Sequence, residues 1–135
     1  MHPRLEEEWP AILEAYPDAE HREPPEHFEI RVELESGGYS APATPLAVLV
    51  PAGYRATGPD GFLVPVGLTF ADRSSLPFTM PDASGAGMPG WALVSFHCID
   101  EQGLSTWRPT ADPERGDNFV GYLQSVEAFL AKGCN

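Results

Sequence analysis

The chain has 135 residues, which suits one domain and leaves too little apolar surface for a second hydrophobic core. With 20 acidic against 8 basic residues its formal net charge is −12, and it has no cluster of lysines and arginines that could bind nucleic acid or an anionic membrane. No stretch approaches the ~18 apolar residues of a membrane span, and residues 1–8 do not resemble a signal peptide, so we expect a cytoplasmic protein with neither kind of partner.

The N-terminal part is expected to form an acidic helix followed by a polar linker. Apolar residues recur at steps of three or four between Arg4 and Tyr16, which predicts a helix with one apolar face. Pro10 interrupts this pattern, because a proline is tolerated in a helix only near the first turn or at a kink. Pro17 is expected to end the helix, and residues 20–26 are expected to be a polar linker.

The middle of the chain predicts a sheet. Residues 27–35 alternate strictly between polar and apolar side chains, which indicates a half-buried strand. Short apolar runs at residues 46–50, 62–66 and 91–98 predict three more strands. Residues 71–90 contain three prolines and three glycines, so we expect a long loop there, and loops of this length inside a small domain tend to be functional.

The last element is expected to be an amphipathic helix that Asp117 caps and Gly133 ends, with Phe119 among its apolar residues. Strands flanked by helices indicate the α+β class, with an antiparallel sheet and the helices on one of its faces. We therefore expect one domain over residues 1–135, in which the acidic helix and linker occupy residues 1–26 and the core residues 27–132.

Cys98 is the candidate nucleophile. It follows an apolar strand and precedes a polar segment, where a thiol can reach solvent and react as a thiolate. The alternative is that Cys98 packs in the core on the same strand face as Phe96. A serine nucleophile would need a histidine and a carboxylate around it, and the Gly-x-Ser-x-Gly motif is absent. The histidines are scattered and no Cys-x-x-Cys occurs, so we expect neither a metal nor a cofactor.

Several motifs follow one another in a recognisable order. These are Tyr54 and Pro59 in a turn-rich segment, then Trp91, Ser95-Phe96-His97, Cys98 and Trp107-Arg108-Pro109. This order, over residues 27–132, resembles the ubiquitin-conjugating enzyme superfamily. It looks most similar to a bacterial branch that is often encoded beside an activating enzyme, a ubiquitin-like protein and a metalloprotease. The resemblance implies a ubiquitin-conjugating-like fold, with an N-terminal helix, an antiparallel β-meander, a long active-site loop and a C-terminal amphipathic helix.

The resemblance also implies a reaction. Cys98 would accept the C-terminus of a ubiquitin-like protein from an activating enzyme as a thioester and pass it to an amine, without a metal or cofactor. His97 would be the general base or an orienting donor. Tyr54, Pro59, Ser105 and Trp107 are the candidate binding residues. From its size we expect Trp107 to fill the core under the last helix, and we expect Tyr54 and Pro59 to hold their turn together.

One departure from the superfamily leaves the activity open. Its His-Pro-Asn motif is missing, and the Asn of that motif stabilises the oxyanion formed when an amine attacks the thioester. The only asparagines are Asn118 and Asn135, so Ser105 or backbone amides near Gly103 would have to replace it. The alternatives are an inactive variant of the same fold that binds a ubiquitin-like partner, or a small acidic inhibitor or immunity-type protein that neutralises a basic enzyme.

Overall fold

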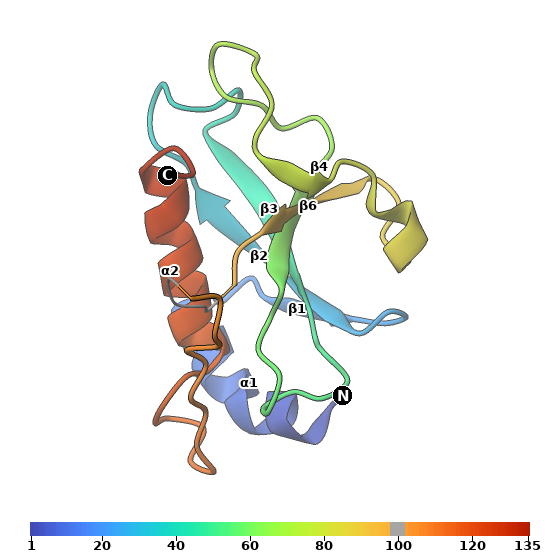
Figure 1. The fold of residues 1–135 in the computed structure, drawn as a ribbon, viewed down its shortest axis with the longest axis vertical. Coiled ribbons are helices and arrows are strands. Elements are labelled where there is room, and N and C mark those ends of the chain that lie inside the picture. Colours follow the sequence, from blue (N-terminus) through green and yellow to red (C-terminus); the bar gives the residue numbers. More distant parts are fainter. Residues whose placement is uncertain (98–101) are drawn as a thin grey trace.

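A computed structural model describes residues 1–97 and 102–135 and shows an α+β protein (Figure 1). The class agrees with the prediction from the sequence. In chain order the elements are α1 (Pro3–Ala15), β1 (Glu20–Arg22), β2 (His27–Glu33), β3 (Ala43–Leu49), β4 (Gly61–Pro65), β5 (Phe78–Met80), the 3-10 helix η1 (Ala83–Ala86), β6 (Trp91–Ser95) and α2 (Phe119–Ala131). Among these residues no helix is both long enough and apolar enough to cross a membrane.

The six strands form one antiparallel sheet in the order β1-β2-β3-β4-β6-β5. In the longest pairing, Ile30 of β2 lies opposite Leu46 of β3. β4 pairs with β6 over its whole length, and Gly61 lies opposite Ser95 at one end of this pair. The predicted strands are therefore present, with ends that differ from the expected ones by a few residues.

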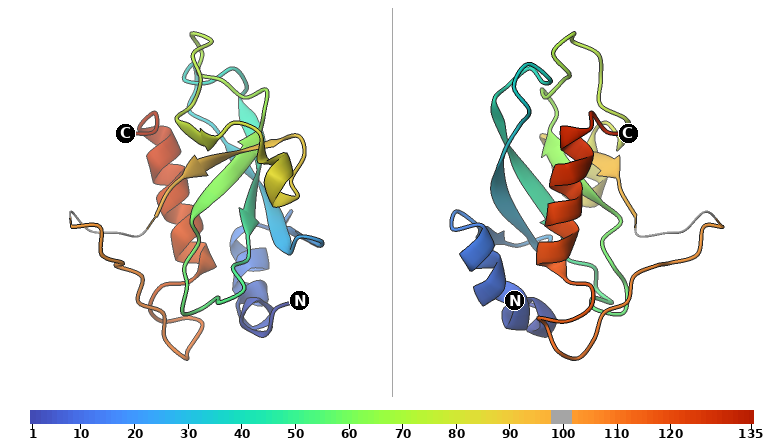
Figure 2. Two further views of the ribbon diagram at one scale, coloured as in Figure 1. Left: turned by 45° about the vertical axis from the view of Figure 1, so that its right-hand side comes forward. Right: turned by 90° about the vertical axis from the view of Figure 1, so that its left-hand side faces the viewer.

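The two helices pack on one face of the sheet, as expected, and α2 runs along this face (Figure 2). The main core includes Leu5 and Ile12 of α1 and residues of both β2 and α2. The opposite face carries a smaller cluster in which Ala47 and Leu63 pack against Ala83 of η1 and against Met88. Because side chains alternate along a strand, each central strand contributes to both clusters.

Two expectations about irregular segments were wrong. The predicted linker contains β1, which pairs with β2 and is tied to it by the ion pair between Arg22 and Glu29. The predicted long loop at residues 71–90 contains β5 and η1, and the side chain of Asp82 caps η1. These elements are three or four residues long, so local periodicity is too short to reveal them.

The expected cap of the last helix was also wrong. Asn118 is the N-cap of α2, and its Oδ1 accepts a hydrogen bond of 2.8 Å from the backbone N–H of Gly121. Asp117 instead accepts a hydrogen bond of 2.6 Å from the N–H of Arg108. The earlier helix begins at Pro3 and continues past Pro10, the residue that interrupted its sequence pattern.

Candidate functional site

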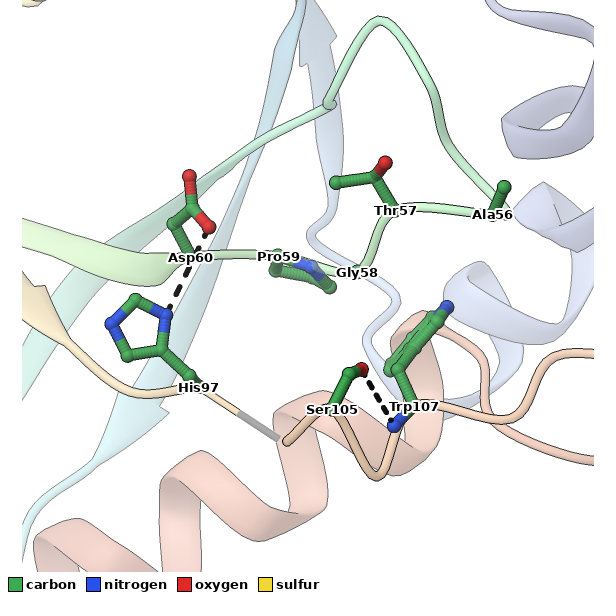
Figure 3. A pocket seen from close by; sticks show the side chains of 8 residues that line it. All are labelled: Ala56, Thr57, Gly58, Pro59, Asp60, His97, Ser105 and Trp107. Carbon is green, nitrogen blue, oxygen red and sulfur yellow. Dashed lines mark hydrogen bonds and ion pairs between the residues drawn. The ribbon is translucent and has the colours of Figure 1, made fainter. Parts of the chain in front are cut away.

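A cleft of about 310 Å³ brings together four of the predicted site residues, Pro59, His97, Ser105 and Trp107 (Figure 3). One wall is residues 56–60, which lead into β4, and the other comes from the chain that follows β6. Cys98, the predicted nucleophile, lies outside the described residues.

Trp107 lines the cleft and is itself buried, with 6% of its surface exposed. Its indole Nε1 donates a hydrogen bond of 2.7 Å to the carbonyl of Arg55. A Cβ at Gly58 would lie 2.7 Å from the indole, so only a glycine at this position allows the ring to pack so closely. Trp107 therefore joins the two walls from the buried side, which agrees with its expected role as a core residue.

Ser105 lies at the exposed side of the same wall, and its Oγ accepts a hydrogen bond of 3.2 Å from the N–H of Trp107. A hydroxyl that accepts one hydrogen bond can still donate its own hydrogen. Ser105 could therefore supply a donor to an oxyanion that forms in the cleft.

His97 lies between a hydroxyl and a carboxylate. Its Nε2 is 2.5 Å from Oγ of Ser95, and its Nδ1 is 3.8 Å from Oδ1 of Asp60 (Figure 3 shows the second pair). The His97 side chain is 44% exposed and that of Asp60 is 84% exposed, so solvent reaches both groups. This arrangement can move a proton between the serine and a bound molecule.

The backbone beside His97 is held by contacts on both sides. The N–H of Phe96 donates a hydrogen bond of 3.1 Å to the carbonyl of Asp60, and the hydroxyl of Tyr122 donates one of 3.0 Å to the carbonyl of Phe96. The ring of Phe96 also packs on that of Phe129, with centroids 4.8 Å apart. His97 is thus placed by the residue before β4 on one side and by α2 on the other.

The sequence did not identify Asp60, and it gave Ser95 no chemical role. The signal for Ser95 was available, because residues two apart on a strand point to the same side and Ser95 is two residues from His97. The approach of Asp60 had no such signal, since it depends on the pairing of Gly61 with Ser95.

Tyr54 does not line this cleft; it belongs to a buried polar cluster. Its hydroxyl donates a hydrogen bond of 2.7 Å to Oε2 of Glu8, and its ring stacks on Phe119 at 4.0 Å. Burial raises the pKa of Tyr54, and the Glu8 carboxylate raises it further. The structure thus gives Tyr54 a role in packing, and a binding role for it stays a prediction.

Glu8 is the centre of this cluster and is only 2% exposed. Its Oε2 also accepts a hydrogen bond of 2.8 Å from Nε of Arg4, and its Oε1 accepts one of 2.7 Å from the N–H of Phe119 at the start of α2. A carboxylate is favourable at a helix N-terminus because of the unpaired N–H groups there. Glu8 therefore connects α1, the turn that carries Tyr54, and α2.

Within the described residues, one set of side chains could hold a metal ion, formed by His21, Glu23 and Glu26. Their ligand-type atoms lie within 4.8 Å of one another. Two of the three are already hydrogen bonded, because Oε2 of Glu26 is 2.8 Å from Nε2 of His21 and also accepts from the N–H of His2. The sequence did not single out this set.

No family model matches the chain, and neither a curated protein nor a solved structure is significantly similar to it. The α+β class follows from the structure itself. The ubiquitin-conjugating-like fold and the conjugation activity stay predictions.

Proposed function

We propose that the protein conjugates a ubiquitin-like protein, carrying its C-terminus as a thioester on Cys98 and passing it to an amine. The observation that carries this proposal is the cleft in which Pro59, His97, Ser105 and Trp107 meet. The resemblance implies that these residues surround one site, although they come from two distant segments of the sequence. His97 directly precedes Cys98 in the chain.

The available groups suit acyl transfer. The Cys98 thiolate would attack the carbonyl carbon of the thioester on the activating enzyme, and the thiolate of that enzyme would leave. An amine would then form a bond to the carbonyl carbon of the new thioester while His97 accepts its proton, and the bond from that carbon to the Cys98 sulfur would break as the thiolate leaves. The hydroxyl of Ser105 would donate to the oxyanion in place of the missing Asn.

The exposed face of α1 supports an interaction with a basic protein surface. Glu6, Glu7 and Glu14 are exposed, whereas Leu5 and Ile12 face the core. Together with the net charge of −12, this face would attract a basic surface of an activating enzyme and speed the encounter.

The test is incubation with an activating enzyme, ATP and its ubiquitin-like protein, followed by electrophoresis with and without a reducing agent. We expect an adduct that the reducing agent removes, that Cys98→Ser abolishes and that the matched control Cys134→Ser keeps. Burial raises the pKa of the Cys134 thiol, which makes it a poor competing nucleophile. An adduct that the reducing agent still removes in Cys98→Ser would contradict the proposal.

A second candidate function is binding of a ubiquitin-like protein without catalysis. Asn118 caps α2, and its side-chain amide also donates a hydrogen bond of 2.9 Å to the carbonyl of Pro113. Asn135 donates one of 3.0 Å to the carbonyl of Lys132. Both asparagines are thus engaged at the ends of α2, which favours a variant without an asparagine oxyanion donor. A complex without an adduct in the same incubation would support this second function.

A further inference from the structure

Ser95, His97 and Asp60 have the mutual placement of a nucleophile, a general base and an orienting carboxylate. Such a set is recognised by geometry rather than by a local sequence motif. The contact of 2.5 Å between Ser95 Oγ and His97 Nε2 is within hydrogen-bond distance. At 3.8 Å from His97 Nδ1, the Asp60 carboxylate lies where it would stabilise the imidazolium that forms when the histidine takes up a proton.

These distances favour Ser95 as the group that His97 activates. When His97 carries its proton on Nδ1, on the side of the Asp60 carboxylate, the lone pair on Nε2 can accept the hydrogen of the serine hydroxyl.

A second observation supplies a place for a substrate. A groove of about 430 Å³ lies on the sheet face opposite the helices, lined by apolar side chains that include Leu49, Met80 and Leu93. It extends to Asp60 and Gly61. A volume of this size is within the range of small-molecule sites, which are mostly apolar with a few polar groups.

The sheet register places Ser95 beside this groove, next to Gly61 and Leu93, which line it. Ser95 is two residues from Leu93 on β6 and therefore points to the same face. Its cross-strand partner is Gly61, which has no side chain to cover the hydroxyl. A Cβ at position 61 would lie 2.2 Å from the carbonyl oxygen of Val94, so the close pairing of β4 and β6 excludes any other residue there.

We propose that Ser95 is the nucleophile of an esterase activity, with His97 as general base and Asp60 as its orienting partner. The substrate class is an ester whose small apolar acyl group occupies the groove lined by Leu49, Met80 and Leu93. This activity does not involve Cys98, so it goes beyond the proposed conjugation. Its tests are independent of the test for a thioester on Cys98.

The steps balance with water as the only co-reactant. Ser95 Oγ forms a bond to the ester carbonyl carbon while its proton passes to His97 Nε2. The bond from that carbon to the alkoxy oxygen then breaks, and the alcohol leaves with the proton from His97. Water next attacks the acyl-serine, giving a proton to His97, and the carboxylic acid leaves as Ser95 recovers its proton.

The direct test treats the full-length protein with a fluorophosphonate, which phosphonylates activated serines as fluoride leaves, and maps the label by peptide mass spectrometry. We expect the label on Ser95. Loss of the His97 base in His97→Gln should slow labelling at least ~100-fold. Failure to label Ser95, or labelling at an equal rate in His97→Gln, would overturn the proposal.

A second measurement follows hydrolysis of p-nitrophenyl butyrate. Ser95→Ala should lower kcat/KM by ~100-fold or more, whereas Ser125→Ala, a matched control on the exposed face of α2, should stay within about twofold. Met80→Lys should raise KM for the butyrate ester more than for the acetate ester, because the groove would lose apolar surface. Unchanged hydrolysis in Ser95→Ala would refute the proposal. If a variant does not fold, the labelling of Ser95 in the unsubstituted protein still tests the proposal.

Discussion

Two polar clusters of this protein use similar groups in opposite surroundings. Glu8, Arg4 and Tyr54 form a cluster around a carboxylate that is 2% exposed, whereas the side chain of His97, which lies between Ser95 and Asp60, is 44% exposed. In the buried cluster both carboxylate oxygens bind donors of the protein itself. The exposed cluster leaves its hydroxyl and imidazole within reach of another molecule. The comparison indicates which polar groups hold the fold and which are available for chemistry.

The largest expected effect comes from removing the centre of the buried cluster. Glu8→Ala would leave Nε of Arg4, the Tyr54 hydroxyl and a backbone N–H of α2 without their acceptor. Breaking a buried ion pair in this way costs about 3–5 kcal/mol of unfolding free energy, measurable by urea denaturation. The control is Glu7→Ala, because Glu7 is exposed and its ion pair with Arg4 contributes little. Equal effects of the two changes would show that Glu8 does not hold the helices together.

A smaller effect is expected from Tyr54→Phe, which keeps the ring stacked on Phe119 and removes only the hydroxyl. The loss of one hydrogen bond to a charged group should lower the unfolding free energy by about 2 kcal/mol.

The same variant should change how stability depends on pH. Burial and Glu8 raise the pKa of Tyr54 in the folded protein, whereas the unfolded phenol ionises near its usual value of about 10. Stability from this group is therefore complete below about pH 10 and is lost as the pH rises beyond it. Denaturation between pH 9 and 11 should show a shallower decline in Tyr54→Phe, and identical declines would contradict this account.

The N-cap of α2 should contribute less to the unfolding free energy than the Tyr54 hydroxyl does. Asn118→Ala removes the acceptor for the N–H of Gly121 and should cost about 1 kcal/mol. Gln124→Ala, an exposed change within the same helix, serves as the control. Thermal denaturation followed by circular dichroism compares the two variants, and a cost at Asn118 no larger than at Gln124 would argue against the cap.

The smallest effect on stability is expected in the exposed cluster. His97→Gln should change the unfolding free energy by less than about 0.5 kcal/mol, because solvent already reaches the side chain. The same variant should lose ester hydrolysis, so stability and activity separate at this residue. A stability loss as large as that of Glu8→Ala would mean that the two clusters do not differ in role.

The sequence predicted the elements that local periodicity can encode. Residues 27–35 alternate so regularly that the prediction matched the start of β2 and missed its end by two residues. The apolar runs predicted the positions of β3, β4 and β6. β1 could not be predicted, because a three-residue charged strand gains its stability from partners such as Glu29 rather than from its own pattern.

The site was predictable only in part, because some of its contacts join distant segments and leave no local sequence pattern. The order of motifs pointed to Pro59, His97 and Trp107, and the missing asparagine pointed to Ser105; the fold brings these residues into one cleft. Glu8 resembled its acidic neighbours, although its spacing from Leu5 and Ile12 placed it on the buried face of the helix. Asp60 depends on contacts between segments far apart in the sequence, which no local pattern records.

The edges of the sheet bear on how copies of this chain behave together. The outermost strands, β1 and β5, have three residues each, and β1 consists of Glu20, His21 and Arg22. A strand of another molecule pairs with a sheet through a long row of unpaired backbone groups, and neither of these two short edge strands has one. Mutual repulsion at a net charge of −12 acts in the same direction. This architecture therefore resists edge-to-edge polymerisation even at high protein concentration.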